Sequence, residues 1–552
     1  MNRNLLLVST FENVSRSFIK PQGGQIFIKK YLEIHHPDLE VDIVDPQIET
    51  VEKVIEKFHK SYTYIGFYCT YPTLINTAKL IIEAYKYNPD SVYFLGGPGV
   101  SYDKVYQICY ADIIIYGEGE KIISDLINVI WDRDDLSKKK ELIKNIAGSF
   151  CVNCIKNQDT YIGKSSCLTN ICNKSDLNTI IPLSDWEIKL HKKYENWTSE
   201  QLNHVYGFPV FLSRGCASLG CKFCSSFSWF KSEFGVRYCD VSVAYKLIKD
   251  INHQMPYVSE ILFEDDNLLS NTEWFQMFVQ MLIEGINAGE INRNNRYIIK
   301  SRLDLLNHNV IEKLSKIGKV QINVGIETYS ENILIELNKT KDPKAYIKKV
   351  NDIFKYKKLY HIKFHCYMIF FTPKTKVNDL IKSIYLASRF LLNGIEISCY
   401  DSLLVFPGSK YDKEWKNDNS MVNWVKYINP LYDSDIYTTH LKNELNIDKE
   451  IYMPYDFVIN DKEVKFIYDK SQKIFKWLFK FYSEAFNWKV RTSFRIAFVK
   501  VLSYVIIIII QDINLKQRIN FINLLRKLAK QITILSDDAV ENMACDDTVV
   551  FA

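Results

Sequence analysis

The sequence predicts an α/β protein in three parts: a doubly wound parallel sheet, a partial (β/α)6 barrel and a mainly helical C-terminal region. Three observations predict this class. Short apolar runs alternate with amphipathic helical segments over the first 130 residues, which is typical of a parallel sheet covered by helices. The same alternation returns in six units after residue 205. Beyond about residue 430, helical segments rich in Trp, Tyr, Phe and Lys follow.

Length and composition limit the classes of function. A chain of 552 residues is long enough for about three domains, and 47% hydrophobic residues supply a large core. The net charge of +5 is small for this length, so we expect no nucleic-acid partner, which would need a clustered basic face. Thirteen cysteines without secretory features indicate a reducing compartment, and we expect a cytoplasmic protein.

We expect no membrane span. The apolar run 5–8 is too short for a signal peptide and predicts a first strand. The run 501–510 is half as long as the roughly 20 residues that a crossing helix needs, so it predicts a buried strand or a core helix. The domain boundaries that we expect are 1–135, 136–205 (a connector), 206–425 and 426–552.

The first 130 residues carry the pattern of a Rossmann-like sheet. Between the expected strands lie a helix over about 24–33 and a second helix with apolar residues at helical spacing from Leu74 to Tyr85. The expected strands are 5–8, 41–45, 64–68, 92–95 and 113–116.

Two glycine clusters follow strands of this sheet, Gly96-Gly97-Pro98-Gly99-Val100-Ser101 and Gly117-Glu118-Gly119-Glu120. Ligands of such sheets bind at the carboxyl ends of strands, and glycine lets a bulky ligand approach the backbone. Strand-to-helix turns also need glycine, so either cluster alone is equally explained by the turn. Neither cluster matches the G-x-G-x-x-G or phosphate-loop pattern, which disfavours a dinucleotide or a nucleoside triphosphate.

The connector is less regular. Cys151 and Cys154 form a C-x-x-C pair, and Cys167 and Cys172 follow, which by spacing alone would admit a zinc site or a second cluster. The run 146–151 predicts a strand, however, whereas a ligand pair needs a tight turn. We therefore favour the reading without a metal.

Six strands are expected in the barrel, and polar residues gather where they end. Asp265 and Asp266 lie near the end of one strand, and Arg302 and Glu327 lie near the ends of two others, at the edge where barrel active sites lie. For any one of these residues, a helix cap or a solvent contact is an equally good explanation. The expected strands are 208–212, 260–267, 297–304, 320–327, 364–370 and 395–400.

Three cysteines lie within nine residues directly after the first barrel strand: Cys216, Cys221 and Cys224. Three thiolates without a fourth ligand nearby suit a four-iron cluster that keeps one iron open. A structural zinc normally recruits four ligands, and a disulfide would leave one thiol over. Three incidental cysteines in a loop remain the less favoured alternative.

In the C-terminal region, Lys alternates with apolar residues over 474–479, and a second apolar helix is expected over 519–525. Such a pattern is more often an amphipathic helix with a solvated face than a basic aromatic surface that grips a substrate.

The first domain resembles the cobalamin-binding domain found ahead of radical SAM domains. The resemblance lies in the order of its motifs: the Gly-Gly-x-Gly turn, the pair Ala111-Asp112, and then Gly-Glu-Gly-Glu. The segment 20–24 and Asp45 also fit that layout. The family's D-x-H-x-x-G motif is absent, and no histidine lies between Leu5 and Ile34, so the lower face of the cobalt has no assignable ligand. The resemblance implies cobalamin contacts at Gly96, Gly97, Gly99, Ser101, Gly117, Glu118 and Gly119.

The cysteine loop resembles the radical SAM signature, with Phe223 as the aromatic residue before its last cysteine. Its first spacing is Cys-x4-Cys, where three intervening residues are commoner; this changes the loop geometry but not the number of ligands. The resemblance covers about residues 1–415. Downstream blocks in the same order are Phe-Glu-Asp-Asp-Asn at 263–267, Ser-Arg-Leu-Asp at 301–304, Gly-Ile-Glu at 325–327 and Phe-Pro-Gly-Ser at 406–409.

This resemblance implies a [4Fe-4S] cluster, S-adenosylmethionine (SAM) on the open iron, and cobalamin above the barrel. It implies SAM contacts at Phe223, Asp265, Asp266, Arg302 and Glu327, and an electron donor such as flavodoxin or ferredoxin. The commonest outcome is methyl transfer to an unreactive carbon of a peptide or small molecule. A rearrangement or cyclisation is the second alternative, and a sensor without turnover is the third; the open iron disfavours the sensor.

Overall fold

The structure is a computed structural model of the 552-residue chain. It describes residues 3–10, 23–45, 49–102, 105–132, 134–139, 142–143, 146, 149–151, 171–192, 195–196, 207–217, 220–224, 235–415, 418, 420–436, 442–443, 446–485, 492–510, 519–528 and 530.

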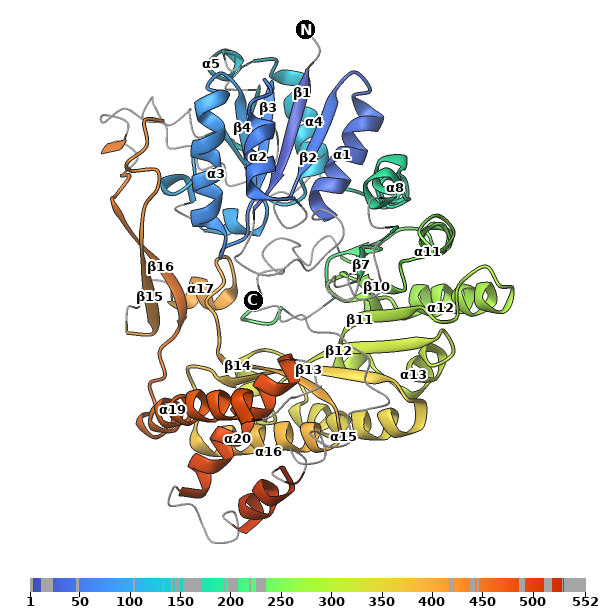
Figure 1. Cartoon of the computed structure of the whole chain (residues 1–552), viewed down its shortest axis with the longest axis vertical. Helices are drawn as coiled ribbons and strands as arrows, with labels where there is room; N and C mark the ends of the chain where they lie inside the picture. The colour runs from blue at the N-terminus through green and yellow to red at the C-terminus, as the bar shows by residue number, and fades with distance from the viewer. Residues whose placement is uncertain are drawn as a thin grey trace.

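The first part of the chain is a six-stranded sheet in the order β2-β1-β3-β4-β5-β6. The first five strands pair in parallel, and β6 joins the edge in the antiparallel direction. This confirms the doubly wound sheet (Figure 1). The strands are β1 (Asn4–Ser9), β2 (Glu40–Val44), β3 (Tyr64–Tyr68), β4 (Val92–Gly96), β5 (Ile113–Ile115) and β6 (Ser149–Cys151).

Helices cover both faces of this sheet, because successive strand residues point to opposite sides and both sets are apolar. Helices α2 and α3 bury residues such as Phe58 and Ala78 in one core, whereas α1 and α4 bury Leu32 and Leu126 in the other. The elements are α1 (Gly23–His35), α2 (Val51–Phe58), α3 (Leu74–Tyr87), η1 (Pro98–Ser101), η2 (Val105–Gln107), α4 (Gly119–Val129) and the short α5 (Asp135–Lys138).

Two helices of the connector lie in the described part of the chain, α7 (Lys174–Ile180) and α8 (Asp185–Lys192). A capping box between Asn173 and Asp176 starts α7. Of the four connector cysteines, Cys154 and Cys167 lie outside the described residues. Cys151 ends β6, and Cys172 is buried before α7.

The second sheet contains six parallel strands in sequence order, β7-β10-β11-β12-β13-β14, which confirms the six predicted barrel units. The strands are β7 (Phe208–Val210), β10 (Glu260–Phe263), β11 (Arg296–Arg302), β12 (Lys319–Glu327), β13 (Lys363–Phe371) and β14 (Glu396–Ser402). The elements between them are α11 (Val241–Gln254), η5 (Leu268–Ser270), α12 (Thr272–Asn287), η6 (Leu303–Leu305), α13 (His308–Leu314), α14 (Glu331–Glu336), α15 (Pro343–Tyr360) and α16 (Val377–Leu392).

A short antiparallel pair stands between the two sheets, β8 (Ser213–Arg214) and β9 (Arg237–Tyr238). The chain that carries the three cysteines leaves through β8 and returns through β9. We call this pair the β8–β9 hairpin.

After α17 (Lys410–Trp415), a hairpin of β15 (Val422–Ile428) and β16 (Glu450–Phe457) runs from the barrel to the first domain (Figure 1). The Tyr71 hydroxyl donates to the carbonyl of Pro454 (2.6 Å), and the buried Asn429 side chain donates to the carbonyl of Gln107 (2.8 Å). The hairpin therefore ties the two ends of the molecule together. The sequence predicts only helical segments beyond about residue 430, so β16 is a departure from that prediction.

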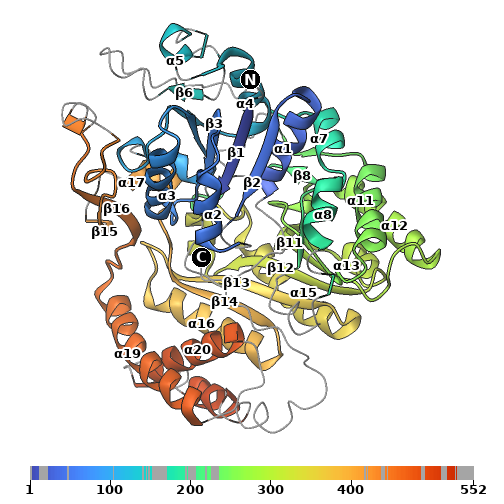
Figure 2. The ribbon, with the colours of Figure 1, turned by 45° about the horizontal axis from the view of Figure 1, so that its top comes forward.

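The C-terminal helices α19 (Lys462–Ala485) and α20 (Thr492–Ile510) pack against α16 and the edge strand β14 (Figure 2). The Lys500 ammonium lies 2.9 Å from the Asp401 carboxylate and fixes α20 on β14. The apolar run 501–510 is thus a core helix. Among the described residues, no helix has the length and apolarity that a bilayer crossing requires.

Candidate functional site

The cysteine loop begins where β8 ends, in the space between the two sheets. Cys221 is buried, whereas Cys216 and Cys224 are half-buried, and none of the three forms a disulfide. Gly215 and Gly220 have φ of 92° and 81°, a region that favours glycine, so the backbone turns sharply on both sides of Cys216. The Cys224 amide donates to the carbonyl of Cys221 (3.2 Å), which closes a turn between the last two cysteines.

The three cysteines are not arranged as ligands of a single ion. In the described part of the chain, one group of three potential ligand atoms lies within 4.8 Å of one another, and it is elsewhere: Glu118, Glu120 and Cys172. A four-iron centre binds each thiolate through a different iron and so holds the thiolates farther apart than a zinc ion does.

A polar group from β11 and β12 surrounds the buried Cys221. The Arg302 guanidinium lies 3.5 Å from the Cys221 sulfur, and the same guanidinium donates two hydrogen bonds to Asp304 (2.9 and 3.0 Å). It also donates to the carbonyl of Lys339 (2.7 Å), whose own ammonium pairs with Glu327 (2.7 Å). Two cations thus lie beside the cysteine that would bind the cluster.

The Glu327–Lys339 pair is buried at the end of β12, where the register with β13 shifts. Glu327 has φ of 64°, a strained value for a residue with a side chain. Burial opposes the charge of Lys339, but Glu327 outweighs it and raises the pKa of this ammonium above its usual value. The lysine therefore stays charged beside Cys221.

The segment after α14 holds the backbone of the cysteine loop. The carbonyl of Leu337 accepts a hydrogen bond from the Lys222 amide (3.0 Å), and the Asn338 side chain donates to the carbonyl of Gly220 (3.0 Å). Asn338 has φ of 51°, a conformation that asparagine tolerates better than most residues. Phe223 packs with neighbouring apolar residues of the same region, including Leu337.

The end of β10 supports the loop from the other side. One carboxylate oxygen of the buried Asp265 accepts hydrogen bonds from the amides of Leu212 (3.0 Å) and Ser213 (2.5 Å) and from the Ser213 hydroxyl (2.5 Å). Its other oxygen is buried without a partner, as are both polar atoms of the Asn267 side chain. Burial raises the pKa of Asp265 to about 6. Unpaired buried groups at this position indicate a ligand that completes their hydrogen bonds.

A cavity of about 370 Å³ lies at the carboxyl ends of the strands of the first sheet. It is lined by five of the seven residues predicted to contact cobalamin: Gly96, Gly97, Gly117, Glu118 and Gly119. Gly99 and Ser101 belong to η1 and are not among its lining residues. The second domain contributes to the same cavity through Phe211, Arg214 and Asp266.

The glycines in and near the cavity are explained in two different ways. A Cβ on Gly97 would lie 2.5 Å from the carbonyl of Cys69, and one on Gly99 would lie 2.7 Å from the Cys69 sulfur, so both positions need glycine for packing within the protein. Among the described residues, a Cβ on Gly24 would meet no atom within 4 Å, and one on Gly96 would meet ordinary contacts at 3.9 Å. No described residue fills the space beside these two glycines.

The cavity also contains an unused hydrogen-bond donor. Gln25 is 2% exposed, and its carbonyl oxygen accepts from the Ser9 hydroxyl (2.5 Å) while its Nε2 has no partner. None of the described residues that line the cavity is a histidine, cysteine or methionine.

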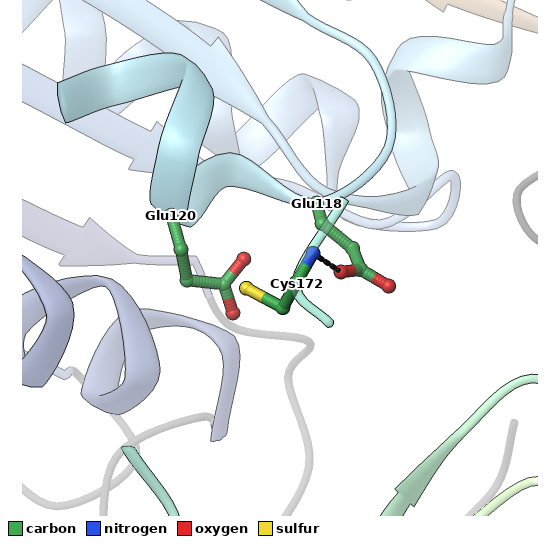
Figure 3. Close-up of side chains that lie close together, drawn as sticks. All are labelled: Glu118, Glu120 and Cys172. Atoms are coloured by element: carbon green, nitrogen blue, oxygen red, sulfur yellow. Dashed lines mark hydrogen bonds between the residues drawn. The ribbon is translucent and has the colours of Figure 1, made fainter. Parts of the chain in front are cut away.

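Glu118 and Glu120, from the second glycine cluster, are engaged by arginines of the β8–β9 hairpin. Glu118 forms two hydrogen bonds with Arg237 (2.5 and 3.1 Å) and accepts one from the Cys172 amide (2.8 Å) (Figure 3). Glu120 pairs with Arg214 (2.6 Å).

The structure therefore forms two neighbouring sites from the predicted residues. Arg302, Glu327 and Asp265 lie around the cysteine loop, and Asp266 lies on the cavity side. Sequence reasoning missed Gln25, Asn267, Asn338 and Lys339. Asn267 closes the quoted run Phe-Glu-Asp-Asp-Asn, which could have identified it. The others carry no motif, because their role comes from packing between distant segments.

The fold combines a parallel sheet that carries a glycine-lined cavity with a six-stranded parallel barrel sheet and a three-cysteine loop. This is the fold of cobalamin-dependent radical SAM enzymes. The chain superposes on OxsB, a cobalamin-dependent SAM radical enzyme solved with aqua-cobalamin and SAM, with a TM-score of 0.63 and 15% identity over 98% of this chain and 82% of that one.

It is also similar to the radical SAM methyltransferase TsrM from Kitasatospora setae. The structure of TsrM with tryptophan substrate and a SAM analogue matches with a TM-score of 0.60 and 12% identity, over 82% of this chain and 85% of that one. The structure with cobalamin and a [4Fe-4S] cluster matches with a TM-score of 0.57 and 13% identity, over 75% and 78%. No family model and no curated protein sequence matches the chain.

Proposed function

We propose that this protein is a cobalamin-dependent radical SAM enzyme, and that it transfers a methyl group to an unactivated carbon of a peptide or small metabolite. The observation that carries the proposal is the position of the cysteine loop, which lies at the carboxyl ends of the barrel strands and faces a glycine-lined cavity at the carboxyl ends of the first sheet.

In this proposal Cys216, Cys221 and Cys224 hold a [4Fe-4S] cluster with one open iron. The loop geometry supports it, because none of the three cysteines is in a disulfide and the loop is held by Leu337 and Asn338. When bound, the cluster and SAM supply a 5′-deoxyadenosyl radical, and cobalamin supplies a carrier for the methyl group. The chain's own task is to orient these groups and to exclude water.

SAM binds next to the loop, at the ends of β10, β11 and β12. The unpaired oxygen of Asp265 and the unpaired carboxamide of Asn267 offer partners to the amino and carboxylate groups of SAM. Arg302 and Glu327 are further candidates, although each already has a partner in the chain, Asp304 and Lys339. Those pairs would rearrange or share their hydrogen bonds when SAM binds.

Cobalamin occupies the cavity of the first sheet. Two features support a bulky ring there: the open space above Gly24 and Gly96, and the unpaired donor of Gln25, which suits an amide or phosphate acceptor of the ligand. The cavity lining offers no nitrogen or sulfur ligand for the lower face of cobalt within the described residues.

The test is anaerobic reconstitution of the whole chain with iron and sulfide, followed by hydroxocobalamin, SAM and a reductant. We expect a cluster of four irons per chain, 5′-deoxyadenosine as a product, and isotopic label from the SAM methyl group in the cobalamin fraction. Cys224→Ala loses the cluster, whereas Cys399→Ala, outside the loop, keeps it. Deoxyadenosine without cobalamin uptake would leave a plain radical SAM enzyme, and cobalamin uptake without methyl label would favour a rearrangement or cyclisation.

A further inference from the structure

Four charged side chains, two buried carboxylates and two partly buried guanidinium groups, join the cavity of the first sheet to the strands that flank the cysteine loop. Glu118 is the N-cap of α4 and Glu120 lies in its first turn, and the two are 4% and 1% exposed. Arg214 belongs to β8 and Arg237 to β9, so the two arginines come from the two strands of one hairpin. We call the two ion pairs, Glu120–Arg214 and Glu118–Arg237, the latch.

The geometry of the latch is specific. The Arg237 guanidinium makes a bidentate contact with Glu118 and also donates to the carbonyl of Cys172 (2.5 Å). Glu118 in turn accepts from the Cys172 amide (2.8 Å), so the connector is held between the acid and the arginine. Bidentate arginine–carboxylate pairs fix orientation as well as distance.

A metal site formed by Glu118, Glu120 and Cys172 is the competing interpretation, because their ligand atoms lie within 4.8 Å of one another (Figure 3). The arginines argue against it. Two guanidinium groups already balance the two carboxylates, and a divalent cation would have to displace them. Burial works to raise the pKa of Glu118, but Arg214 and Arg237 outweigh it and hold this pKa below its usual value. Burial and the nearby acids Glu120 and Glu118 raise the pKa of the Cys172 thiol, so it stays protonated and a poor ligand.

The latch occupies the wall between the two sites. Glu118, Glu120 and Arg214 all line the cavity of the first sheet. On the other side, the chain from residue 215 to residue 236 carries the three cysteines and is bounded at both ends by the hairpin that the arginines belong to. A change in the latch would therefore move the start and the end of the cysteine loop relative to the cavity.

From this placement we propose that Glu118 and Glu120 are positioning residues: through Arg237 and Arg214 they hold the β8–β9 hairpin against the cavity wall and so set the separation between the cluster and the cavity ligand. The second glycine cluster then has two roles. Its glycines let the ligand approach the backbone, and its two acids hold the β8–β9 hairpin of the neighbouring domain. This inference rests on the proposed function in one respect: that function identifies the two groups as an iron–sulfur cluster and cobalamin.

The decisive variant is the neutral pair Glu120→Gln with Arg214→Gln. Either single substitution leaves a buried charge without its partner and can fail by misfolding, whereas the double variant removes both charges. The matched control is Lys30→Gln with Glu187→Gln. That buried ion pair (2.5 Å) also joins the first domain to the connector, through α1 and α8, but it does not touch the hairpin.

Two measurements are made on the full chain. In the protein without cofactors, hydrogen exchange of the β8–β9 amides is expected to rise about tenfold in the latch variant and to stay unchanged in the control. In protein loaded with cluster and cobalamin, the magnetic dipolar interaction between the reduced cluster and cob(II)alamin gives their separation. We expect the latch variant to show a broadened distribution of separations with a longer mean.

An unchanged separation in the latch variant overturns the positioning role, even if the amides exchange faster, since the ion pairs would then be only structural. Unchanged exchange in the cofactor-free chain overturns the latch itself. If wild-type protein takes up no cobalamin, the proposed function fails, and the exchange measurement still decides whether the acids hold the hairpin.

Discussion

At the scale of single residues, the chemistry of the site depends on where charge is buried. Arg302 and Lys339 place two cations next to the Cys221 sulfur, and each is held by an acid of the barrel. Hydrogen bonds and positive charges near a cluster stabilise its reduced, more negative form. These two side chains therefore favour reduction, which is the step that the proposed reaction needs first.

Replacing Arg302 tests this. In Arg302→Gln the charge beside Cys221 is lost, and we expect the midpoint potential of the reconstituted cluster to fall by about 60 mV, equivalent to about 1.4 kcal/mol for one electron. The measurement is a redox titration followed by electron paramagnetic resonance. Arg296→Gln is the control, because Arg296 begins the same strand and pairs with Glu260 at its far end. Equal potentials in all three proteins would contradict the role of the charge.

Asp265 gives a pH dependence. Burial raises its pKa to about 6, above the value of about 3.9 in an unfolded chain. Between these values the unfolded state releases the proton while the folded state keeps it, so the contribution of Asp265 to stability falls as pH rises from about 4 to about 6. In the iron-free chain, we expect the free energy of unfolding of Asp265→Asn to rise relative to that of the wild type by on the order of 2 kcal/mol between these two pH values. Denaturant unfolding at pH 4, 5, 6 and 7 measures this difference in stability. If the stabilities of the two proteins change in parallel with pH, the prediction is refuted.

At the scale of elements, the cavity is shaped by the start of α1. Gly23 and Gly24 open this helix and line the cavity together with Gln25. A glycine near the start of a helix lowers its stability relative to alanine, and no described atom lies close enough to a Cβ on Gly24 to require glycine there. The proposed cobalamin site would account for this glycine.

Gly24→Ala distinguishes an effect on the stability of α1 from an effect on cobalamin binding. The added methyl favours the helix, so we expect the free energy of unfolding to stay equal or rise by up to about 1 kcal/mol. The same methyl projects into unfilled space at the cavity, and we expect cobalamin affinity to fall at least about tenfold, equivalent to about 1.4 kcal/mol. Absorbance titration and denaturant unfolding measure both. Lys53→Ala, on the exposed side of α2, serves as the control. Unchanged affinity would remove Gly24 from the binding site.

The elements also show how far sequence reasoning reaches. Both sheets were predictable, because each strand is a local apolar run and each helix has its own periodicity. The β15–β16 hairpin was missed because β16 contains Pro454 in its middle, and a proline within a run argues against a strand. Asn338 and Lys339 were missed for a different reason: they meet the cysteine loop from more than 100 residues away, and no local pattern records that contact.

At the scale of the whole molecule, several connections among the described residues hold the first domain over the barrel. They include the latch and the β15–β16 hairpin, and the Lys30–Glu187 pair fixes the connector to the first domain. The hairpin buries Leu431 and Met453 in the core of the first domain, so it is part of that core although it follows the barrel in the sequence.

Asn429 tests the contribution of the hairpin. Its buried side chain donates to the carbonyls of Gln107 and Asp448 and accepts from the Leu431 amide. In Asn429→Ala these groups lose their partner, and we expect a loss of about 1 to 3 kcal/mol of stability, measured by denaturant unfolding. Asn423→Ala, an exposed position on the same hairpin, should change stability by less than about 0.5 kcal/mol. Equal effects of the two substitutions would contradict this account.

One contact between the domains has a consequence for exchanging them. A Cβ on Gly23 would lie 2.3 Å from the Phe211 ring, so the start of α1 packs closely against the residue that follows β7. A chimaera that joins this first domain to a foreign barrel would carry away most of the cavity but not the aromatic residue that closes it. A domain exchange that preserves the cavity must therefore transfer Gly23 and Phe211 together.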